Sequence, residues 1–199
     1  MANQLEEQAL CLAQDPTADA LLSRDPFALV AGMTLDQQYP MEHAFRGPQK
    51  LVERLGLDRL DPAVIADYEP ESFADLAATP PAIHRYGRSM AARLQQIAKV
   101  IVDEYDGDAS QIWTSARTGE ELLARLKALP GWGDMKARIF TALLGKQLGV
   151  RPRGWREAAG AYGEAKATRS VADVRDQASL LAVRAFKQEQ KKAAKAAAG

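Results

Sequence analysis

The turn Leu129-Pro130-Gly131-Trp132-Gly133 separates two apolar runs, which extend over residues 120–129 and 139–144. Pro130 ends the first predicted helix, and the two glycines let the backbone turn tightly and approach a partner closely. The second helix then begins with free N–H groups, which together with the helix dipole favour an anion. This pattern is typical of a helix-hairpin-helix, which grips one DNA phosphate without reading sequence. An ordinary tight turn between two packed helices is the alternative interpretation.

The distribution of charge supports an anion site at this turn. The whole chain holds 26 acidic and 26 basic residues, so its formal net charge is zero. Residues 1–80 contain 14 acids and five bases, whereas residues 126–156 contain one acid and seven bases. The basic block therefore coincides with the hairpin, and a local basic face matters more for phosphate binding than the global sum. A solvated basic surface is the alternative.

Composition limits the kinds of protein and site. Hydrophobic residues make up 47% of the 199 residues, which indicates a globular chain with one core or two small lobes. The single cysteine, Cys11, excludes an internal disulfide, a cysteine-ligated iron–sulfur cluster and a cysteine-rich zinc site. No apolar run reaches membrane-spanning length and the first residues lack a signal-peptide pattern, so we expect a cytoplasmic protein that does not contact a membrane.

Helical periodicity runs along the whole chain. Asp25-Pro26 reads as an N-cap followed by a first-turn proline. Residues 27–35 are apolar on nearly every face, which predicts a helix buried at the centre of a domain. Amphipathic helices are predicted over residues 41–55 and 89–105, and no strand ladder is evident. The expected fold class is all-α.

The predicted helices divide the chain into four segments. Residues 1–26 are predicted to form N-terminal helices that pack with the C-terminal lobe, and residues 27–130 to form the central helical lobe. Residues 131–186 are expected to supply the second hairpin helix and the C-terminal helices, the last over residues 171–186. Residues 187–199 are rich in lysine and alanine and are predicted to be a frayed basic tail.

Residues 23–155 resemble the HhH-GPD superfamily of base-excision DNA glycosylases, and in particular an actinobacterial-type branch of these repair proteins. Two landmarks carry the resemblance. The apolar helix ends in Leu35-Asp36-Gln37-Gln38, similar to the family's Leu-x-Gln-Gln turn, and the Leu-Pro-Gly-x-Gly hairpin follows about ninety residues later. Their order and spacing are more specific than either motif alone.

The glutamine pair suits the chemistry that such an enzyme needs. A glycosylase pulls a nucleotide out of the base stack and leaves a hole. The flat amide of Gln37 or Gln38, at a helix end, fits into that hole and can hydrogen-bond the orphaned base. Tyr39, the next residue, is placed to stack on a base. The alternative is that both glutamines only cap the helix before Pro40.

The resemblance implies a two-lobed molecule with a DNA cleft between the lobes, and several further DNA contacts. The backbone amides of Gly131, Gly133 and Lys136 are expected to hold a phosphate. Backbone carbonyls near Lys127, Leu129 and Trp132 hold a monovalent cation in such proteins, and no other cofactor is implied. The remaining expected DNA contacts are Trp132, Lys136, Arg138, Arg153 and Arg156.

The chain departs from the family at its catalytic positions. The family's catalytic aspartate follows the second hairpin helix, but residues 149–155 contain no acid. The lysine of bifunctional members corresponds to Met135, and the adjacent Lys136 points about 100° away on a helix. If the protein cuts a glycosidic bond, another carboxylate must serve. Asp36, beside the glutamine pair, is the first candidate and Glu157 the second, although Asp36 also reads as an acid at a helix end.

Three functions remain open at this point. The first is a monofunctional DNA glycosylase that uses water to release a flipped, damaged base. The second is a non-catalytic module that binds damaged or bent double-stranded DNA. The third is a helical protein-interaction domain in which the hairpin is only structural. A monomer is expected, and salt-dependent DNA binding separates the first two functions from the third.

Overall fold

The computed structural model describes residues 9–197, and helices make up its architecture. Within this range no strand is present, and one isolated bridge pairs Thr118 with Arg153. The predicted all-α fold is confirmed, and no helix in the described range is long and apolar enough to cross a bilayer. The elements are α1 (Pro16–Arg24), α2 (Pro26–Leu35), α3 (Met41–Leu55), α4 (Pro62–Asp67), α5 (Pro70–Ala78), α6 (Gly87–Glu104), α7 (Gln111–Thr114), α8 (Gly119–Ala128), α9 (Asp134–Gln147), α10 (Trp155–Ala159), α11 (Gln177–Ala197) and two 3-10 helices, η1 (Gly160–Gly163) and η2 (Val171–Asp173).

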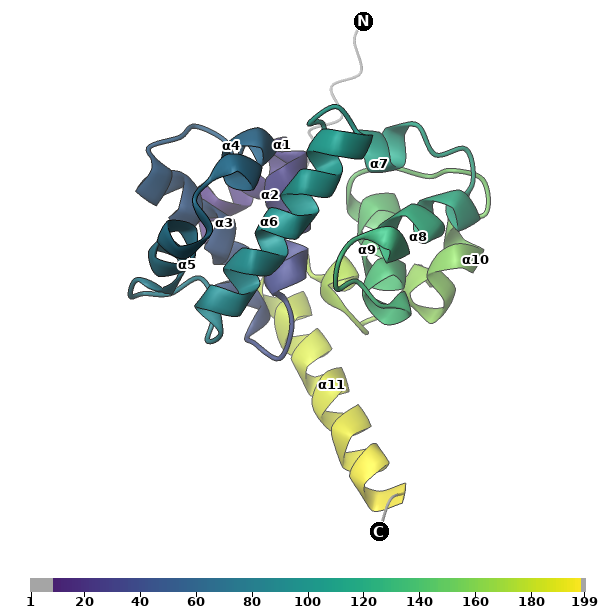
Figure 1. Cartoon of the computed structure of the whole chain (residues 1–199). Coiled ribbons are helices and arrows are strands. Elements are labelled where there is room, and N and C mark those ends of the chain that lie inside the picture. The colour runs from purple at the N-terminus through teal and green to yellow at the C-terminus, as the bar shows by residue number, and fades with distance from the viewer. Residues whose placement is uncertain (1–8, 198–199) are drawn as a thin grey trace, which may run out of the picture.

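Figure 1 shows two lobes, with α1 to α6 in one and α7 to α10 in the other, and α11 projecting from the junction between them. In the first lobe α2 packs on α1, α3 and α6, while α4 and α5 pack on α6. In the second lobe α9 packs on α8, α10 and both 3-10 helices. The predicted two-lobed arrangement is therefore present.

The helices divide between the lobes differently from the expected grouping. Helices α7 and α8 belong by sequence to the expected lobe of residues 27–130, but they lie with α9 (Figure 1). The described part of residues 1–26 packs on the first lobe, where Arg46 of α3 donates from Nε to the carbonyl of Ala13 at 2.9 Å. Residues 1–8 lie outside the described range. Helix α8 lies in the second lobe because the hairpin holds it against α9.

Helix α2 is the buried centre of the first lobe, as its apolar pattern predicted. Asp25 caps the helix by accepting the N–H of Ala28 at 3.1 Å. Every residue from 27 to 35 is buried. Gly32 admits the ring of Phe45 from α3, because a β-carbon on Gly32 would lie 2.6 Å from that ring.

Aromatic side chains assemble the second lobe around α9. Phe140 is buried and meets Trp132 edge-on, with ring centroids 5.1 Å apart, and Trp113 at 6.0 Å. Trp155, at the start of α10, covers Gly145 so closely that a β-carbon on Gly145 would lie 2.4 Å from the ring. These contacts hold α7, α10 and the hairpin turn onto one helix.

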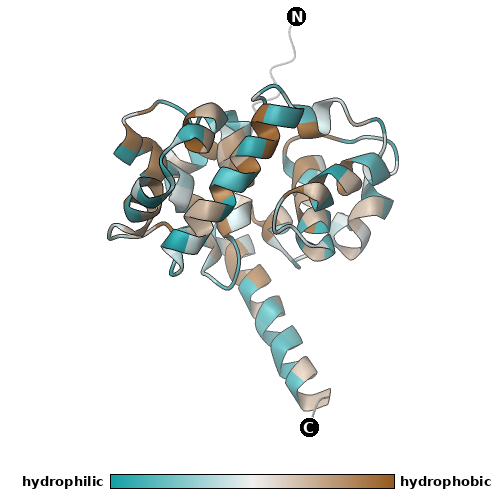
Figure 2. Ribbon diagram, in the orientation of Figure 1, coloured by the Kyte–Doolittle hydropathy of each residue, from teal (hydrophilic) through white to brown (hydrophobic). Residues whose placement is uncertain are grey.

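The C-terminal region departs from the expectation of a helix over residues 171–186 and a frayed tail over residues 187–199. The structure has the short η2 and then a single helix that continues to Ala197. Asp176 starts this helix by accepting an N–H three residues on, at 2.7 Å. The projecting part is hydrophilic along most of its length (Figure 2), and it is helical because alanine, lysine and glutamine have high helix propensity.

Lys146 of α9 and Asp173 of η2 form a nearly buried ion pair at 2.5 Å, with side chains 7% and 4% exposed. We predict that Lys146→Met lowers the free energy of unfolding by about 3–5 kcal/mol, because it leaves a buried carboxylate without its cation. Urea denaturation measures the change. Lys99→Met is the control, since Lys99 pairs with Asp103 on the surface and its loss should cost under about 1 kcal/mol. Equal losses in the two variants would contradict the prediction.

Candidate functional site

The helix-hairpin-helix expected from the sequence is present. Helix α8 ends at Ala128, and α9 begins at Asp134. Across the turn, the N–H of Trp132 donates to the carbonyl of Leu129 at 3.0 Å. Gly131 adopts a φ of +77°, in the left-handed region that glycine occupies without strain. Gly131 thus allows the tight turn, whereas Gly133 has an ordinary extended conformation with a φ of −88°.

The start of α9 presents free backbone N–H groups. Gly133 is the N-cap: its carbonyl accepts the N–H of Ala137 at 3.1 Å, and no side chain caps the helix. The N–H groups of the first turn therefore have no partner within the helix. A β-carbon on Gly133 would meet no atom within 4 Å, so a ligand has access to this end of the helix. Such an end attracts anions.

A guanidinium from the first lobe lies against the same turn. Nη1 of Arg93, in α6, is 1.6 Å from the position that a β-carbon on Gly131 would take. Glycine at residue 131 suits the positive φ, and it leaves room for the end of the Arg93 side chain. The local sequence of the hairpin contains no signal for Arg93, because the two residues come from different lobes.

The side chain of Trp132 anchors the hairpin to the first lobe. The residue is 5% exposed, and its indole Nε1 donates to the hydroxyl of Thr34 near the end of α2 at 3.1 Å. That hydroxyl in turn donates to the carbonyl of Val30 at 2.8 Å. Trp132 was expected to contact DNA. Its ring is instead buried against Phe140, and its backbone N–H is bonded within the turn, so its role here is structural.

The ammonium of Lys136 caps the C-terminus of α2. Its Nζ donates to the backbone carbonyls of Met33 at 2.5 Å, Thr34 at 3.2 Å and Asp36 at 3.1 Å. The last carbonyls of a helix have no partner within it, so the ammonium satisfies groups that would otherwise be left unpaired. All three of its N–H donors are used in this way. The side chain of Lys136 was expected to contact a phosphate, but in the structure it joins the two lobes instead.

Burial also changes the acidity of this amine. It lowers the pKa of Lys136 to about 8, and the nearby carboxylate of Asp36 opposes the change only in part. At neutral pH the amine still carries its proton, as the three donated hydrogen bonds require.

The glutamine turn follows the capped end of α2. Gln37 and Gln38 are exposed, and Gln38 has a φ of +52°. Arg85 donates from Nη2 to Oε1 of Gln38 at 3.1 Å. His84 holds the backbone beside it: its Nε2 lies 3.1 Å from the carbonyl of Gln37, and its Nδ1 accepts the N–H of Tyr86 at 3.0 Å. The loop of residues 84–86 therefore orients the glutamines.

His84 is a neutral structural anchor, a role that the sequence did not reveal. The residue is 1% exposed, and burial lowers the pKa of its imidazole. Because Nδ1 accepts a hydrogen bond, the proton is assigned to Nε2, which donates to the glutamine turn. The ring of Tyr39 packs on it with centroids 4.6 Å apart, while Tyr86 remains 54% exposed beside the turn.

A cleft of about 1020 Å³ lies between the two lobes and α11. The glutamine turn forms one wall, the first turns of α9 form the second, and α11 forms the third. Met135, at the position of the family's lyase lysine, also lines it. The cleft thus brings together four residues that the sequence singled out: Asp36, Gln38, Tyr39 and Lys136.

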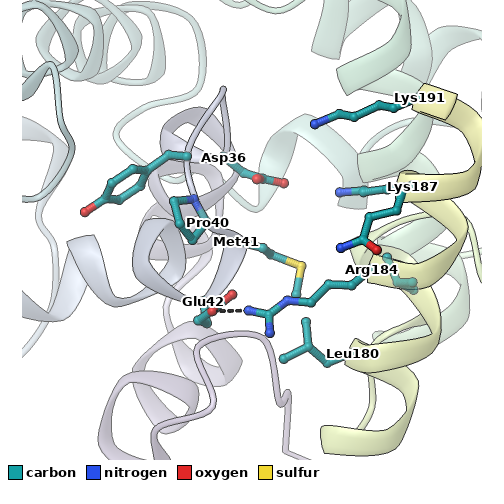
Figure 3. A pocket seen from close by; sticks show the side chains of 11 residues that line it. Asp36, Pro40, Met41, Glu42, Leu180, Arg184, Lys187 and Lys191 are labelled. Carbon is teal, nitrogen blue, oxygen red and sulfur yellow. Dashed lines mark hydrogen bonds and ion pairs between the residues drawn. The ribbon is translucent and has the colours of Figure 1, made fainter. Parts of the chain in front are cut away.

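Asp36 is a carboxylate on the wall of this cleft. Figure 3 shows it pointing across an adjoining pocket of about 350 Å³ toward Lys187 and Lys191 of α11. Burial raises the pKa of Asp36, and the positive charges of Lys187 and Lys136 oppose that rise. A desolvated acid that faces amines within a cleft is typical of a functional group.

Arg138 is held between the hairpin and α10. Its Nε pairs with Asp134 at 2.6 Å, and its Nη1 donates to the carbonyl of Ala158 at 2.6 Å. Asp134 also pairs with Lys127 at 3.1 Å, and these two bases lower the pKa of Asp134. The expected positive charge of the hairpin is thus partly neutralised from within.

The other predicted residues lie away from the cleft. The carbonyl of Arg153 accepts the N–H of Gly119 at 2.8 Å, at the end of α8 opposite the hairpin. Arg153 and Glu157 line a separate hollow, and the guanidinium of Arg156 stacks 4.5 Å from the ring centre of Trp155. The structure therefore does not place Glu157 beside Asp36.

The three carbonyls expected to hold a monovalent cation lie in and next to the hairpin turn. The carbonyl of Leu129 accepts the N–H of Trp132, which leaves it a second lone pair. Carbonyl oxygens are ligands of the kind that a monovalent cation takes, and binding of such a cation by the carbonyls of Lys127, Leu129 and Trp132 remains a prediction.

Comparison with known proteins is consistent with this geometry. The model of one family, described as HhH-GPD superfamily base excision DNA repair protein, matches residues 31–198. None of the curated proteins and none of the solved structures compared with the chain matches it. The family match covers most of the chain, including the glutamine turn, the hairpin and α11.

The contact between Lys136 and α2 leads to a stability prediction. Lys136→Met keeps the apolar stem but leaves the carbonyls of Met33 and Thr34 without this donor, so we expect the free energy of unfolding to fall by about 1–3 kcal/mol. Lys127→Met removes an exposed hairpin lysine and should cost under about 1 kcal/mol. Chemical denaturation of both variants measures the difference. If Lys136→Met is as stable as the parent, the amine does not hold the lobes together.

Proposed function

The chain belongs to the HhH-GPD superfamily of base excision DNA repair proteins, and from this premise we propose that it is a monofunctional DNA glycosylase. It binds damaged double-stranded DNA, flips one nucleotide into the cleft and uses water to release the base. The observation that carries the proposal is the position of Asp36. This desolvated carboxylate lies on the wall of one cleft together with the glutamine turn and the first turn of the hairpin helix.

Two features of the hairpin support phosphate binding. The uncapped N-terminus of α9 offers backbone N–H groups, and the space around Gly133 is open. Arg93 adds a guanidinium against Gly131, and guanidinium groups bind phosphate through paired N–H donors. Neither feature reads a base, so this part of the site positions the DNA without sequence preference. If a monovalent cation binds the turn carbonyls, it adds positive charge beside the same phosphate.

The exposed side chains of the glutamine turn suit the base stack. Gln37 and Gln38 project from a turn whose backbone is bonded to His84, and Arg85 holds the side chain of Gln38. Tyr86 is large, aromatic and 54% exposed beside them. An amide wedge fills the hole left by a flipped nucleotide, and an aromatic ring stacks on a neighbouring base.

The chemistry needs a negative charge near the sugar. When the bond between C1′ and the base nitrogen breaks, the base takes the bonding electrons and the sugar becomes cationic. Water then bonds to C1′ and loses a proton. Ionised Asp36 stabilises the cation and accepts that proton, and the amines of Lys136 and Lys187 favour its ionised form.

A specific observation favours a second candidate, a non-catalytic module that binds damaged or bent DNA. Residues 149–155 correspond to the segment in which the family has its catalytic aspartate, and in this chain that segment contains no acid. The structure places Arg153 of that segment at the far end of α8, and Glu157 faces a different hollow from Asp36. Under this second candidate function, the hairpin and the glutamine turn still bind DNA, but no base is released.

The test of the chemistry is Asp36→Asn, assayed for base release on a panel of duplexes that each carry one damaged base. We expect release to fall by about 10²–10³-fold with DNA affinity retained, because the variant keeps the size of the side chain but removes its charge. The parent should lose activity as pH falls through a pKa above the ordinary 3.8 of an aspartate.

Glu157→Gln is the matched control and should release base at the parent rate, because Glu157 lines a separate hollow. A loss of release in Glu157→Gln but not in Asp36→Asn would transfer the role to Glu157. If the parent releases no base from any duplex yet binds damaged DNA tightly, the non-catalytic candidate is the function.

The phosphate site is tested by Gly133→Asp. An aspartate at this N-cap accepts the free N–H groups itself, so α9 stays capped while the phosphate is displaced. We expect a 10- to 100-fold loss of affinity, about 1.5–3 kcal/mol for a charged hydrogen bond, on every duplex alike. Gly133→Ala is the control and should bind nearly as the parent does, because its methyl group meets open space. Unchanged binding by a folded Gly133→Asp protein would argue against phosphate binding here.

A further inference from the structure

Helix α11 carries a row of lysines that begins at the cleft. Lys187 and Lys191 line both the cleft and the adjoining pocket, and Lys195 lies one helical turn further along. The spacing of four residues places all three on one side of the helix. Lys192, by contrast, lines neither cavity and is turned about 100° from Lys191.

The base of this helix is fixed to the body. Leu180 and Val183 are its buried residues, and Arg184 forms an ion pair with Glu42 of α3 (Figure 3). The guanidinium of Arg169 lies 5.3 Å from the ring centre of Phe186. These contacts set the direction in which α11 leaves the junction of the lobes (Figure 1). The lysine row is therefore held at a defined place beside the cleft.

The projecting part has an excess of positive charge. Residues 187–195 contain four bases and one acid, Glu189, and Asp36 faces the row only at its Lys187 end. Like charges four residues apart destabilise an isolated helix by about 0.2–0.5 kcal/mol per pair. The row of Lys187, Lys191 and Lys195 contains two such pairs. A row of this kind is stabilised when an anion with repeated charges lies along it.

We propose that α11 is a second DNA-backbone contact, in which Lys187, Lys191 and Lys195 bind successive phosphates of the strand that enters the cleft. The inference rests on the proposed function only in that DNA occupies the cleft, and it does not require base release. The row is continuous with the cleft in which DNA is proposed to bind, and this continuity favours DNA as the occupant over an acidic face of a protein or of a second copy of this chain.

The dimensions agree with this role. Eight residues of helix span about 12 Å, from Lys187 to Lys195. A strand of duplex DNA advances about 3.4 Å per phosphate along the helix axis, so this length faces about three to four phosphates. The proposed phosphate contact of the hairpin comes from α9, so α11 supplies an independent contact from another wall of the cleft.

The experiment compares Lys191→Gln with Lys192→Gln, two adjacent lysines on different sides of one helix. The probe is a short duplex with one tetrahydrofuran abasic-site analogue, and affinity is measured across a range of salt concentrations. We expect Lys191→Gln to reduce the slope of log affinity against log salt by about 0.9, or about eightfold in affinity at 0.1 M salt. The double variant Lys187→Gln/Lys191→Gln should lose about twice that slope. Lys192→Gln should leave the slope unchanged.

Equal slopes for Lys191→Gln and Lys192→Gln would overturn the inference, whether both fall or neither does. It would also be overturned if Lys191→Gln abolished self-association of the protein and left DNA binding intact. The readout is separate from catalysis. Slopes that differ as expected, with no base released by the parent, support the α11 contact while the proposed glycosylase activity fails. Normal base release with equal slopes would support the glycosylase activity and overturn the α11 contact. Circular dichroism confirms that each variant keeps its helical content.

Discussion

The ammonium of Lys136, bonded to three carbonyls at the end of α2, is the contact on which the rest of the site depends. Lys136 is in the first turn of the hairpin helix, and the carbonyls it binds lead directly into the glutamine turn. With the bond from Trp132 to Thr34, it fixes the start of α9 in one lobe against the glutamine turn of the other. The cleft exists because these two ends cannot move independently.

The elements with local signals were predictable from the sequence. The apolar run of residues 27–35 identified the buried helix, and the proline and glycines of residues 129–133 identified the hairpin. The directions of side chains were not predictable. A lysine in a basic hairpin reads as a phosphate ligand, because sequence reveals its charge but not that α2 ends within its reach. Arg93 was missed for the same reason, since its partner Gly131 lies in the other lobe.

The cleft joins two electrostatic demands that are often separate. A phosphate backbone is bound by amines, whereas a cationic sugar is stabilised by a carboxylate. Here Asp36 faces Lys136 and Lys187, so the amines that suit DNA also help to keep the acid charged in a desolvated place. The family usually draws its carboxylate from the segment after the hairpin, whereas the acid that we propose, Asp36, lies on the first lobe beside the glutamines. Under this proposal, the acid and the side chains that enter the base stack share one turn of backbone.

The bonds that join the lobes connect residues very distant in sequence. The indole of Trp132 and the hydroxyl of Thr34 are 98 residues apart, and Lys136 is 103 residues from Met33. Contacts between residues so distant in sequence close large loops. The loss of chain entropy on closure opposes their formation, so they form after contacts between nearby residues. The buried apolar residues of the two lobes form one continuous cluster, so the cleft takes its shape only when these distant segments have come together. Its geometry is thus a property of both lobes at once, and neither lobe could form the cleft alone.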